Sequence, residues 1–470
     1  MRLSRVLIAV AALLLAVGLS VGVLTGGLTG LVRAGLSSDP LATLTPTPSA
    51  ARPSPTPPEA RPTASLTPVL APVTAPPKPD PARVAARIAA VDRMGVGKAF
   101  SGLVLDAESG TTLYQHRAGT AFIPASTTKI LTAAAALSRL GPEHRFATTV
   151  TAPAAGQIVL VGGGDPYLAT KSRAGRASIA TLAGRTAASL KRSGQRRVAL
   201  RYDASLFSGP AWHPRWPGGY RDQVTRVSAL WVDEGRVSGG SPGPRVADPP
   251  AEAAKAFAAA LKRQGIAVSA TKRGTSPARA PVIATVESPP LQQVVELLLM
   301  SSDNDASEVL FRHTALAAGQ PGSFDGGRRA VRAELAALGV LSEGVRIDDG
   351  SGLSRETRVP ATTLARVVRL AMGEERPDLR GVVTGLPVAG VEGSLRFRFG
   401  DDASRAGRGL VRGKTGTLRR VQTLAGYVRG ADGSLLVYAL LVNNAKNEYE
   451  SVVWLDRVTA ALAGCGCRRN

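Results

Sequence analysis

The sequence predicts an α+β fold: an antiparallel sheet flanked by helices, split by an inserted mixed α/β region. Apolar stretches with helical composition cover residues 129–137 and 291–300. Two strand-like segments, 421–429 and 435–442, are joined by a Gly-Ala-Asp-Gly turn, which is typical of a hairpin. Between residues 151 and 280, short strand-like segments alternate with alanine-rich helical ones. Such alternation is typical of a separate layered α/β unit.

The N-terminus predicts a membrane segment followed by a spacer. Arg2 and Arg5 precede residues 6–32, which carry no charge, and a helix of that length exceeds a hydrocarbon core of about 30 Å. The basic residues favour a cytoplasmic start and delivery of the rest outside. We therefore expect residues 1–33 to be a membrane anchor or signal, cleaved or uncleaved, on the extracytoplasmic face of a bacterial membrane. Residues 34–82, rich in proline, alanine and threonine, are expected to be a disordered linker.

The remaining length is enough for a large core and for more than one domain. We expect one domain built from residues 83–150 and 281–470, with residues 151–280 inserted between its two parts. The net charge of +23 comes mostly from arginine. Such a surface attracts anionic headgroups or acidic wall polymers, although scattered arginines also occur without any partner.

A first candidate motif is S-x-x-K at Ser126 and Lys129, followed by an apolar helical run. In a helix, these two side chains lie one turn apart on the same face. A serine hydroxyl becomes a nucleophile when a neighbouring base takes its proton, and a desolvated lysine can be that base. Without other evidence, Ser126 is equally well explained as a helix cap.

A second motif, Ser302-Asp303-Asn304, falls in the break between two apolar helical stretches. Ser302 offers a hydroxyl that can relay a proton between Lys129 and a leaving group. The Asn304 amide can hydrogen-bond both the base and a substrate carbonyl. Asp303 is expected to be an N-cap.

The third motif is Lys414-Thr415-Gly416-Thr417, in a strand-like context next to the predicted hairpin. A lysine and two threonine hydroxyls on an edge strand suit a substrate carboxylate. The backbone N–H groups of Thr417 and Ser126 can form an oxyanion hole. Read alone, the motif is an ordinary exposed Lys-Thr turn.

All three motifs in this order match the signature of serine enzymes that acylate themselves on penicillin-like or D-alanyl substrates. Ser126 and Ser302 are 176 positions apart, whereas Ser302 and Lys414 are 112 apart, so a large insertion follows the first motif. Short sequence motifs at 162–166 and 348–354 add to the match. The chain resembles the class C D-alanyl-D-alanine carboxypeptidases/endopeptidases, which are low-molecular-mass penicillin-binding proteins with inserted domains. The resemblance implies a serine β-lactamase/transpeptidase-like domain.

The resemblance also implies the activity: trimming of peptidoglycan stem peptides through an acyl-enzyme on Ser126, inhibition by β-lactam antibiotics, and no cofactor. The implied catalytic residues are Ser126, Lys129, Ser302 and Asn304, and the implied substrate-binding residues are Lys414, Thr415, Gly416 and Thr417. Two alternatives stay open. One is a serine β-lactamase, which needs an activated water for deacylation. The other is a catalytically silent cell-wall-binding protein.

Other classes have little support in the sequence. The four histidines form no zinc-peptidase pattern, and no nucleic-acid-binding signature is present, so we expect neither a metal nor a nucleic acid partner. Cys465 and Cys467 are placed to form a small ring outside the cell. Trp212, Trp216 and Tyr220 belong to an aromatic-proline cluster, which is more typical of a packed loop than of a polymer groove.

Overall fold

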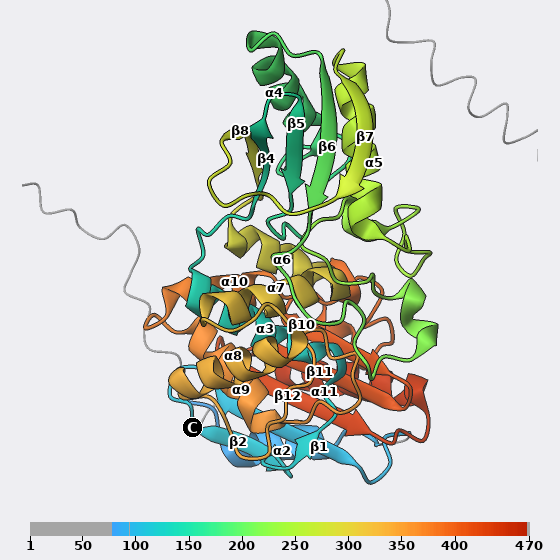
Figure 1. The fold of residues 1–470 in the computed structure, drawn as a ribbon. Helices are drawn as coiled ribbons and strands as arrows, with labels where there is room; N and C mark the ends of the chain where they lie inside the picture. Colours follow the sequence, from blue (N-terminus) through green and yellow to red (C-terminus); the bar gives the residue numbers. More distant parts are fainter. Residues whose placement is uncertain (1–77, 94, 468–470) are drawn as a thin grey trace, which may run out of the picture. The chain divides into compact units, whose positions relative to one another are not determined.

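The computed structural model describes residues 78–93 and 95–467 (Figure 1). The predicted anchor, residues 1–33, and most of the predicted linker lie outside the described residues. The last part of that linker is described, and there Asp80 caps helix α2 (Pro81–Ala89). None of the helices within the described ranges is long and apolar enough to cross a membrane.

The first sheet is antiparallel, in the order β10-β11-β12-β1-β2. Its strands are β1 (Phe100–Asp106), β2 (Thr112–His116), β10 (Val411–Leu418), β11 (Val421–Arg429) and β12 (Leu435–Asn443). Strand β10, which carries the third motif, is therefore an edge strand. The β11–β12 hairpin is the one that the sequence predicts.

Both faces of this sheet are covered. Since alternate side chains of each strand point to opposite faces, each strand contributes to two cores. One face contributes Leu103, Val437 and Leu441 to a core shared with the central helices. The other contributes Val104 and Leu436 to a core shared with α2 and α11 (Glu448–Ala463). The helices of the first core are α3 (Thr128–Leu140), α6 (Leu291–Ser301), α7 (Asn304–Ala317), α8 (Phe324–Ala337) and α9 (Ala361–Met372).

Helix α3 lies within the first core, and every residue from Thr128 to Leu137 is buried. A run of alanines lets neighbouring helices approach it closely on all sides, and a helix that is apolar all round belongs in a core. Gly141 ends the helix with a φ of 86°. The helix therefore gives its N-terminal end, where the first motif lies, a fixed position.

The second sheet lies in the inserted region and is mixed, in the order β7-β6-β5-β4-β8. The pairs β4–β5 and β4–β8 are antiparallel, whereas β5–β6 and β6–β7 are parallel. Its strands are β4 (Ala147–Ala154), β5 (Gln157–Val161), β6 (Arg197–Asp203), β7 (Ala267–Arg273) and β8 (Val282–Glu287). Helices α4 (Ile179–Arg192) and α5 (Pro249–Arg263) pack against it around a separate core.

The predicted α+β class with an inserted mixed region is thus confirmed. The second sheet includes residues 147–150 and β8, just outside the expected insertion at 151–280, and the exact domain boundaries stay a prediction. Near the end of the chain, Cys465 and Cys467 form a disulfide. The Cys467 carbonyl accepts a hydrogen bond of 2.6 Å from the Asp80 backbone N–H, which joins the first and last described segments.

Candidate active site

The first motif lies where a short 3-10 helix, η1 (Ala125–Thr127), runs into α3. Lys129 Nζ lies 2.9 Å from Ser126 Oγ. Ala125 has a φ of 48°, a left-handed conformation that is unfavourable for a residue with a Cβ. Gly352 lies against this turn, since a Cβ at that position would be 1.9 Å from the Ala125 carbonyl oxygen. Close packing thus holds Ser126 at the start of α3.

Lys129 is fully buried and makes three hydrogen bonds. Besides Ser126 Oγ, its ammonium donates to Asn304 Oδ1 at 2.7 Å and to the Ser351 carbonyl at 2.8 Å. Burial lowers its pKa to about 8, although nearby carboxylates, Glu308 first among them, oppose the shift. A lysine with this pKa is partly neutral near pH 7 and is therefore suited to take a proton from Ser126.

The second motif forms the turn between α6 and α7. Ser302 ends α6 in the left-handed conformation, with a φ of 59°. Asp303 is the N-cap of α7 and accepts a hydrogen bond of 3.0 Å from the Ala306 N–H. The Asn304 amide is held on both sides, because its Nδ2 donates to the Gln223 carbonyl at 3.0 Å while its Oδ1 accepts from Lys129.

The third motif approaches from the edge of the first sheet. Lys414 is fully buried, and its Nζ donates to Ser302 Oγ and to the Thr415 carbonyl, both at 2.8 Å. Burial lowers the pKa of Lys414 well below its usual value, and the charge of Lys129 lowers it further. Two lysines thus converge on one site from opposite sides, one by way of Asn304 and the other by way of Ser302.

Gly416 brings the strand backbone against the nucleophile. A Cβ at this position would lie 2.1 Å from Thr423 Oγ1, 2.7 Å from the Pro124 carbonyl and 3.0 Å from the Ser126 nitrogen. Only glycine fits there without movement of the neighbouring atoms. The close approach places the β10 backbone beside the Ser126 N–H, as an oxyanion hole shared by the two segments requires.

The two threonines of the third motif have partners within the protein. Thr415 Oγ1 donates to Ser394 Oγ at 2.8 Å, and Thr417 Oγ1 donates to Gln422 Oε1 at 3.0 Å. Thr417 is exposed, so its hydroxyl lies at the open side of the site. All eight predicted site residues therefore lie in or next to one cluster, although their roles in the reaction stay predictions.

Comparison with known proteins places the chain in a family that agrees with the three motifs. The sequence model of the D-Ala-D-Ala carboxypeptidase 3 (S13) family matches residues 82–242 and 239–456. The chain belongs to this family. It is 36% identical to "Carboxypeptidase DacB" of Mycolicibacterium smegmatis over 383 residues, covering 78% of this chain and 81% of the relative. It is 28% identical to the "D-alanyl-D-alanine carboxypeptidase" of an Actinomadura species over 450 residues, with the same two coverages.

The fold is also that of a solved protein. The crystal structure of penicillin binding protein 4 (dacB) from Haemophilus influenzae matches with a TM-score of 0.66 and 21% identity, over 80% of this chain and 97% of that one. The same protein, complexed with a novel β-lactam, matches with a TM-score of 0.62 and 20% identity, over the same shares of the two chains. These matches confirm the prediction that the chain is a serine-type D-Ala-D-Ala carboxypeptidase with a split domain, and its family is S13. This is a penicillin-binding, peptidoglycan-hydrolysing family that acts on the cell wall, outside the cytoplasm.

The Ser302 hydroxyl accepts a hydrogen bond from Lys414, whereas Asn304 accepts one from Lys129, and the predicted relay role of Ser302 stays a prediction. The left-handed turn at Ser302 explains this arrangement, because it separates the directions of the two side chains.

In the sequence, residues 348–354 support the family resemblance but indicate no role at the site; in the structure this loop contacts Lys129. The Ser351 carbonyl accepts from Lys129, and the Gly350 carbonyl accepts from Thr132 Oγ1 at 2.7 Å. Glu308 fixes the loop by accepting from the Ser351 and Gly350 N–H groups at 2.8 and 3.1 Å. The sequence contains the Asp-Asp-Gly-Ser-Gly motif of this loop, but nothing in the motif specifies which carbonyl accepts a hydrogen bond from Lys129.

A second missed feature is a brace from the inserted region to the second motif. Residues 223–245 bond three consecutive residues of that motif and its helix. The Gln223 carbonyl holds Asn304, the Thr225 N–H donates to Asp305 Oδ1 at 2.6 Å, and Arg236 Nη2 lies 3.2 Å from Asp303 Oδ2. We call residues 223–245 the bracing loop.

Charges reinforce the bracing loop. Glu234, Asp303 and Asp305 place carboxylate oxygens within 4.8 Å of one another, the kind of spacing that a metal ion needs. Guanidinium groups contact these carboxylates: Arg236 ion-pairs with Glu234 and Asp303, and Arg245 Nη2 lies 3.3 Å from Asp305 Oδ2. Burial raises the pKa of Glu234 to about 9 and that of Asp305 to about 7, and the neighbouring charge of Asp303 raises both further.

The aromatic-proline cluster is mainly a packed loop, as its composition favoured. Trp216 is 4% exposed, and its Nε1 donates to Asp349 Oδ2 at 2.8 Å. Trp212 packs edge-on against Trp216, with 5.3 Å between ring centroids, and keeps part of its surface exposed. Trp216 thus supports the loop that closes the site.

Proposed function

We propose that Ser126 is the nucleophile with which this S13 enzyme removes the terminal D-alanine of peptidoglycan stem peptides. The observation that carries the proposal is the 2.9 Å contact between Ser126 Oγ and the buried, pKa-lowered Lys129 Nζ. Neutral Lys129 accepts the hydroxyl proton while Ser126 Oγ bonds to the carbonyl carbon of the penultimate D-alanine. Asn304 and the Ser351 carbonyl keep the Lys129 amine directed at Ser126.

The remaining groups act on the charges of the substrate. The backbone N–H groups of Ser126 and Thr417 stabilise the oxyanion, and the close approach at Gly416 supports this role. Lys414, Thr415 and Thr417 hold the terminal carboxylate. As the peptide C–N bond breaks, Ser302 relays the proton held by Lys129: its hydroxyl gives a proton to the leaving nitrogen and takes one from the Lys129 ammonium, and D-alanine departs. Water then hydrolyses the ester and regenerates the Ser126 hydroxyl.

The same site suits two related reactions. A β-lactam presents a strained amide and a carboxylate in a similar arrangement, so it acylates Ser126 and blocks the site; the β-lactam complex of the Haemophilus influenzae protein supports this inference. A D-alanyl cross-link has a bulkier leaving amine but the same scissile bond, so we infer DD-endopeptidase activity as a second reaction. The uncharged run at residues 6–32 supports a single-pass N-terminal anchor, or a cleaved signal if the protein is secreted.

The experiment is to incubate the full chain with a synthetic stem pentapeptide ending in D-Ala-D-Ala and to measure free D-alanine. We expect release by the wild type and none by Ser126→Ala. A matched peptide ending in D-Ala-L-Ala controls for contaminating peptidases and should be left intact. Release of D-alanine by the Ser126→Ala variant would contradict the proposal.

A chromogenic cephalosporin tests the β-lactamase alternative. The proposed carboxypeptidase consumes about one equivalent and then stops, because its acyl-enzyme hydrolyses slowly. Continuous turnover of the cephalosporin, without release of D-alanine from the peptide, would favour a β-lactamase instead.

A further inference from the structure

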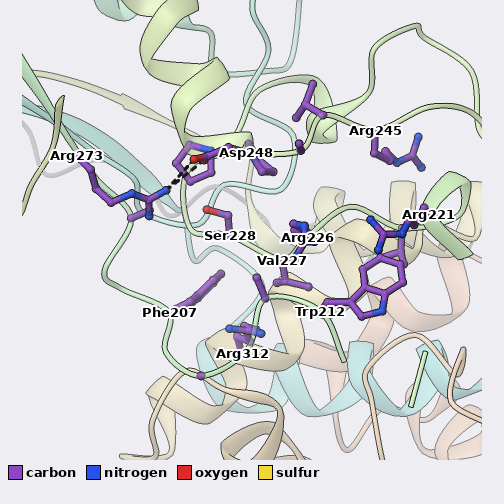
Figure 2. Close-up of a pocket in the computed structure, with 18 residues that line it drawn as sticks. Phe207, Trp212, Arg221, Arg226, Val227, Ser228, Arg245, Asp248, Arg273 and Arg312 are labelled. Carbon is purple, nitrogen blue, oxygen red and sulfur yellow. Dashed lines mark hydrogen bonds and ion pairs between the residues drawn. The ribbon is translucent and has the colours of Figure 1, made fainter. Parts of the chain in front are cut away.

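The structure contains a second recess, away from the three motifs, that is rich in arginine. It is a cavity of about 540 Å³ bordered by loop segments 204–212 and 221–228, the first turn of α5 and the end of β7. Figure 2 shows its charged and aromatic side chains surrounding one space. Five arginines but only one carboxylate line it: Arg221, Arg226, Arg245, Arg273 and Arg312, with Asp248.

Two of the five arginines are neutralised by the protein itself. Arg273 Nη2 lies 3.1 Å from Asp248 Oδ2, the ion pair drawn in Figure 2. Arg245 pairs with Asp305, although its Nε–H is buried and has no hydrogen-bond partner among the described residues. The other three, Arg221, Arg226 and Arg312, form no ion pair within 4 Å among residues 78–93 and 95–467, although Glu308 acts on Arg312 from a greater distance.

Arg312 places a buried cation in the wall, and the Glu308 carboxylate compensates it only from beyond ion-pair distance. It is 1% exposed, and its Nη atoms donate to the carbonyls of Ser208, Gly322 and Pro210. Its guanidinium lies 4.5 Å from the Phe324 ring centroid, and its Nε–H is another buried donor with no partner in the described chain. A buried charge with no ion-pair partner is costly, and an anion in the cavity would add to the partial compensation from Glu308.

Arg221 and Arg226 complete the recess from its exposed side. Both are exposed, and Arg221 lies over the Trp212 ring at 5.8 Å from the centroid. Trp212 and Phe207 add flat apolar faces between the charges. The recess therefore offers guanidinium groups from several elements, together with surfaces for the uncharged part of a ligand.

We propose that this recess binds a phosphodiester-linked polymer of the cell wall, with its phosphates on the arginines and its polyol or sugar units on Trp212 and Phe207. A phosphodiester stays ionised at any physiological pH. Its tetrahedral oxygens can be approached by guanidiniums from different directions, whereas a planar carboxylate is satisfied by one guanidinium fork. A recessed cavity accepts a chain segment but does not fit a flat lipid surface. This inference stands independently of the roles proposed for the three motifs.

The test is calorimetric titration of the full chain with an oligomer of six glycerol phosphate units. Arg221→Ala/Arg226→Ala should weaken binding roughly tenfold or more, the usual effect of losing charge-assisted hydrogen bonds. Arg192→Ala/Arg263→Ala removes two exposed arginines from α4 and α5 outside the recess and should leave the affinity unchanged. Raising the salt concentration should weaken wild-type binding strongly.

The charge-preserving pair Arg221→Lys/Arg226→Lys separates a lost charge from a disturbed fold, and we expect an affinity between the wild type and the alanine pair. Three results would each overturn the proposal. The alanine pair and the control pair could bind equally well. An oligoglutamate of equal charge could bind as tightly as the glycerol phosphate oligomer. Vesicles of phosphatidylglycerol could bind through Arg221 and Arg226 while the oligomer does not.

Discussion

The sheet that carries Lys414 and the sheet of the inserted region each have five strands, but they differ in how their faces are covered. In the first, β1 is buried at every residue and β11 and β12 at nearly every residue. In the second, β7 is exposed along most of its length. The third motif lies on the first sheet. Close packing on both faces of that sheet limits the movement of its strands.

The comparison shows that the two regions contribute differently to the site. The doubly covered sheet and α3 hold Lys414, Gly416 and Lys129. The inserted region contributes none of the eight predicted site residues, yet its bracing loop holds the second motif through Gln223 and Arg236. The inserted region can therefore influence the geometry of a site whose predicted residues all lie outside it.

The largest effect is expected from the core side, at Lys129. Lys129→Met removes the base while filling most of the same volume. We expect the rate of acylation by a fluorescent penicillin to fall by about 10²–10⁴-fold, the usual contribution of a general base. Labelling kinetics measure this. A variant that is labelled within a few-fold of the wild-type rate would exclude Lys129 as the base.

The next effect concerns the backbone contact at the edge of the first sheet. Gly416→Ala adds a Cβ that clashes with Thr423 and Pro124, so β10 must move away from Ser126. We expect acylation to slow by about 10²–10³-fold, the cost of disturbing an oxyanion hole. Gly400→Ala is the control, because a Cβ at Gly400 meets nothing within 4 Å. Equal rates in the two variants would argue against the proposed oxyanion contact.

A smaller effect is expected in the bracing loop. Arg236→Gln leaves the carboxylate of Asp303 without its cation, which should lower the free energy of unfolding by about 3 kcal/mol. Displacement of Asn304 should slow acylation by about tenfold to 10²-fold. Denaturant unfolding and labelling kinetics measure the two effects.

Arg346→Gln is the matched control for this change. It breaks the exposed ion pair between Arg346 and Glu356 and should cost less than about 1 kcal/mol. If Arg236→Gln unfolded as readily as expected but kept the wild-type acylation rate at temperatures where it is folded, the bracing loop would have no part in positioning Asn304.

The smallest effect is a pH dependence. Because the pKa of Lys129 is about 8, the neutral fraction rises from roughly a tenth at pH 7 to nearly all at pH 9, and the acylation rate should rise about tenfold. Since the pKa of Lys129 is lower in the folded state than the ordinary lysine value of 10.5, the unfolded chain binds more protons between pH 8 and 10.5. The contribution of Lys129 to stability therefore increases with pH in that window. An acylation rate that stays flat from pH 7 to 9 would contradict the assigned base.

The sequence predicted the fold class and the residues that gather at the site because both follow local patterns. Spacing in a helix relates Ser126 to Lys129, and a strand next to a hairpin presents Lys414. It did not predict the partner of Ser302, since that depends on a single left-handed residue. The bracing loop was also missed, because the contact between Arg236 and Asp303 is created only by tertiary packing and no sequence pattern marks Arg236 as the partner of Asp303.

The central claim is that three distant segments form one site around a single activated hydroxyl, that of Ser126. Intact-mass measurement after treatment with benzylpenicillin tests it most directly. We predict one covalent adduct on the wild-type chain, located by peptide mapping to Ser126, and none on Ser126→Ala. An adduct of the same mass on the Ser126→Ala variant, or no adduct on the wild type, would contradict the account.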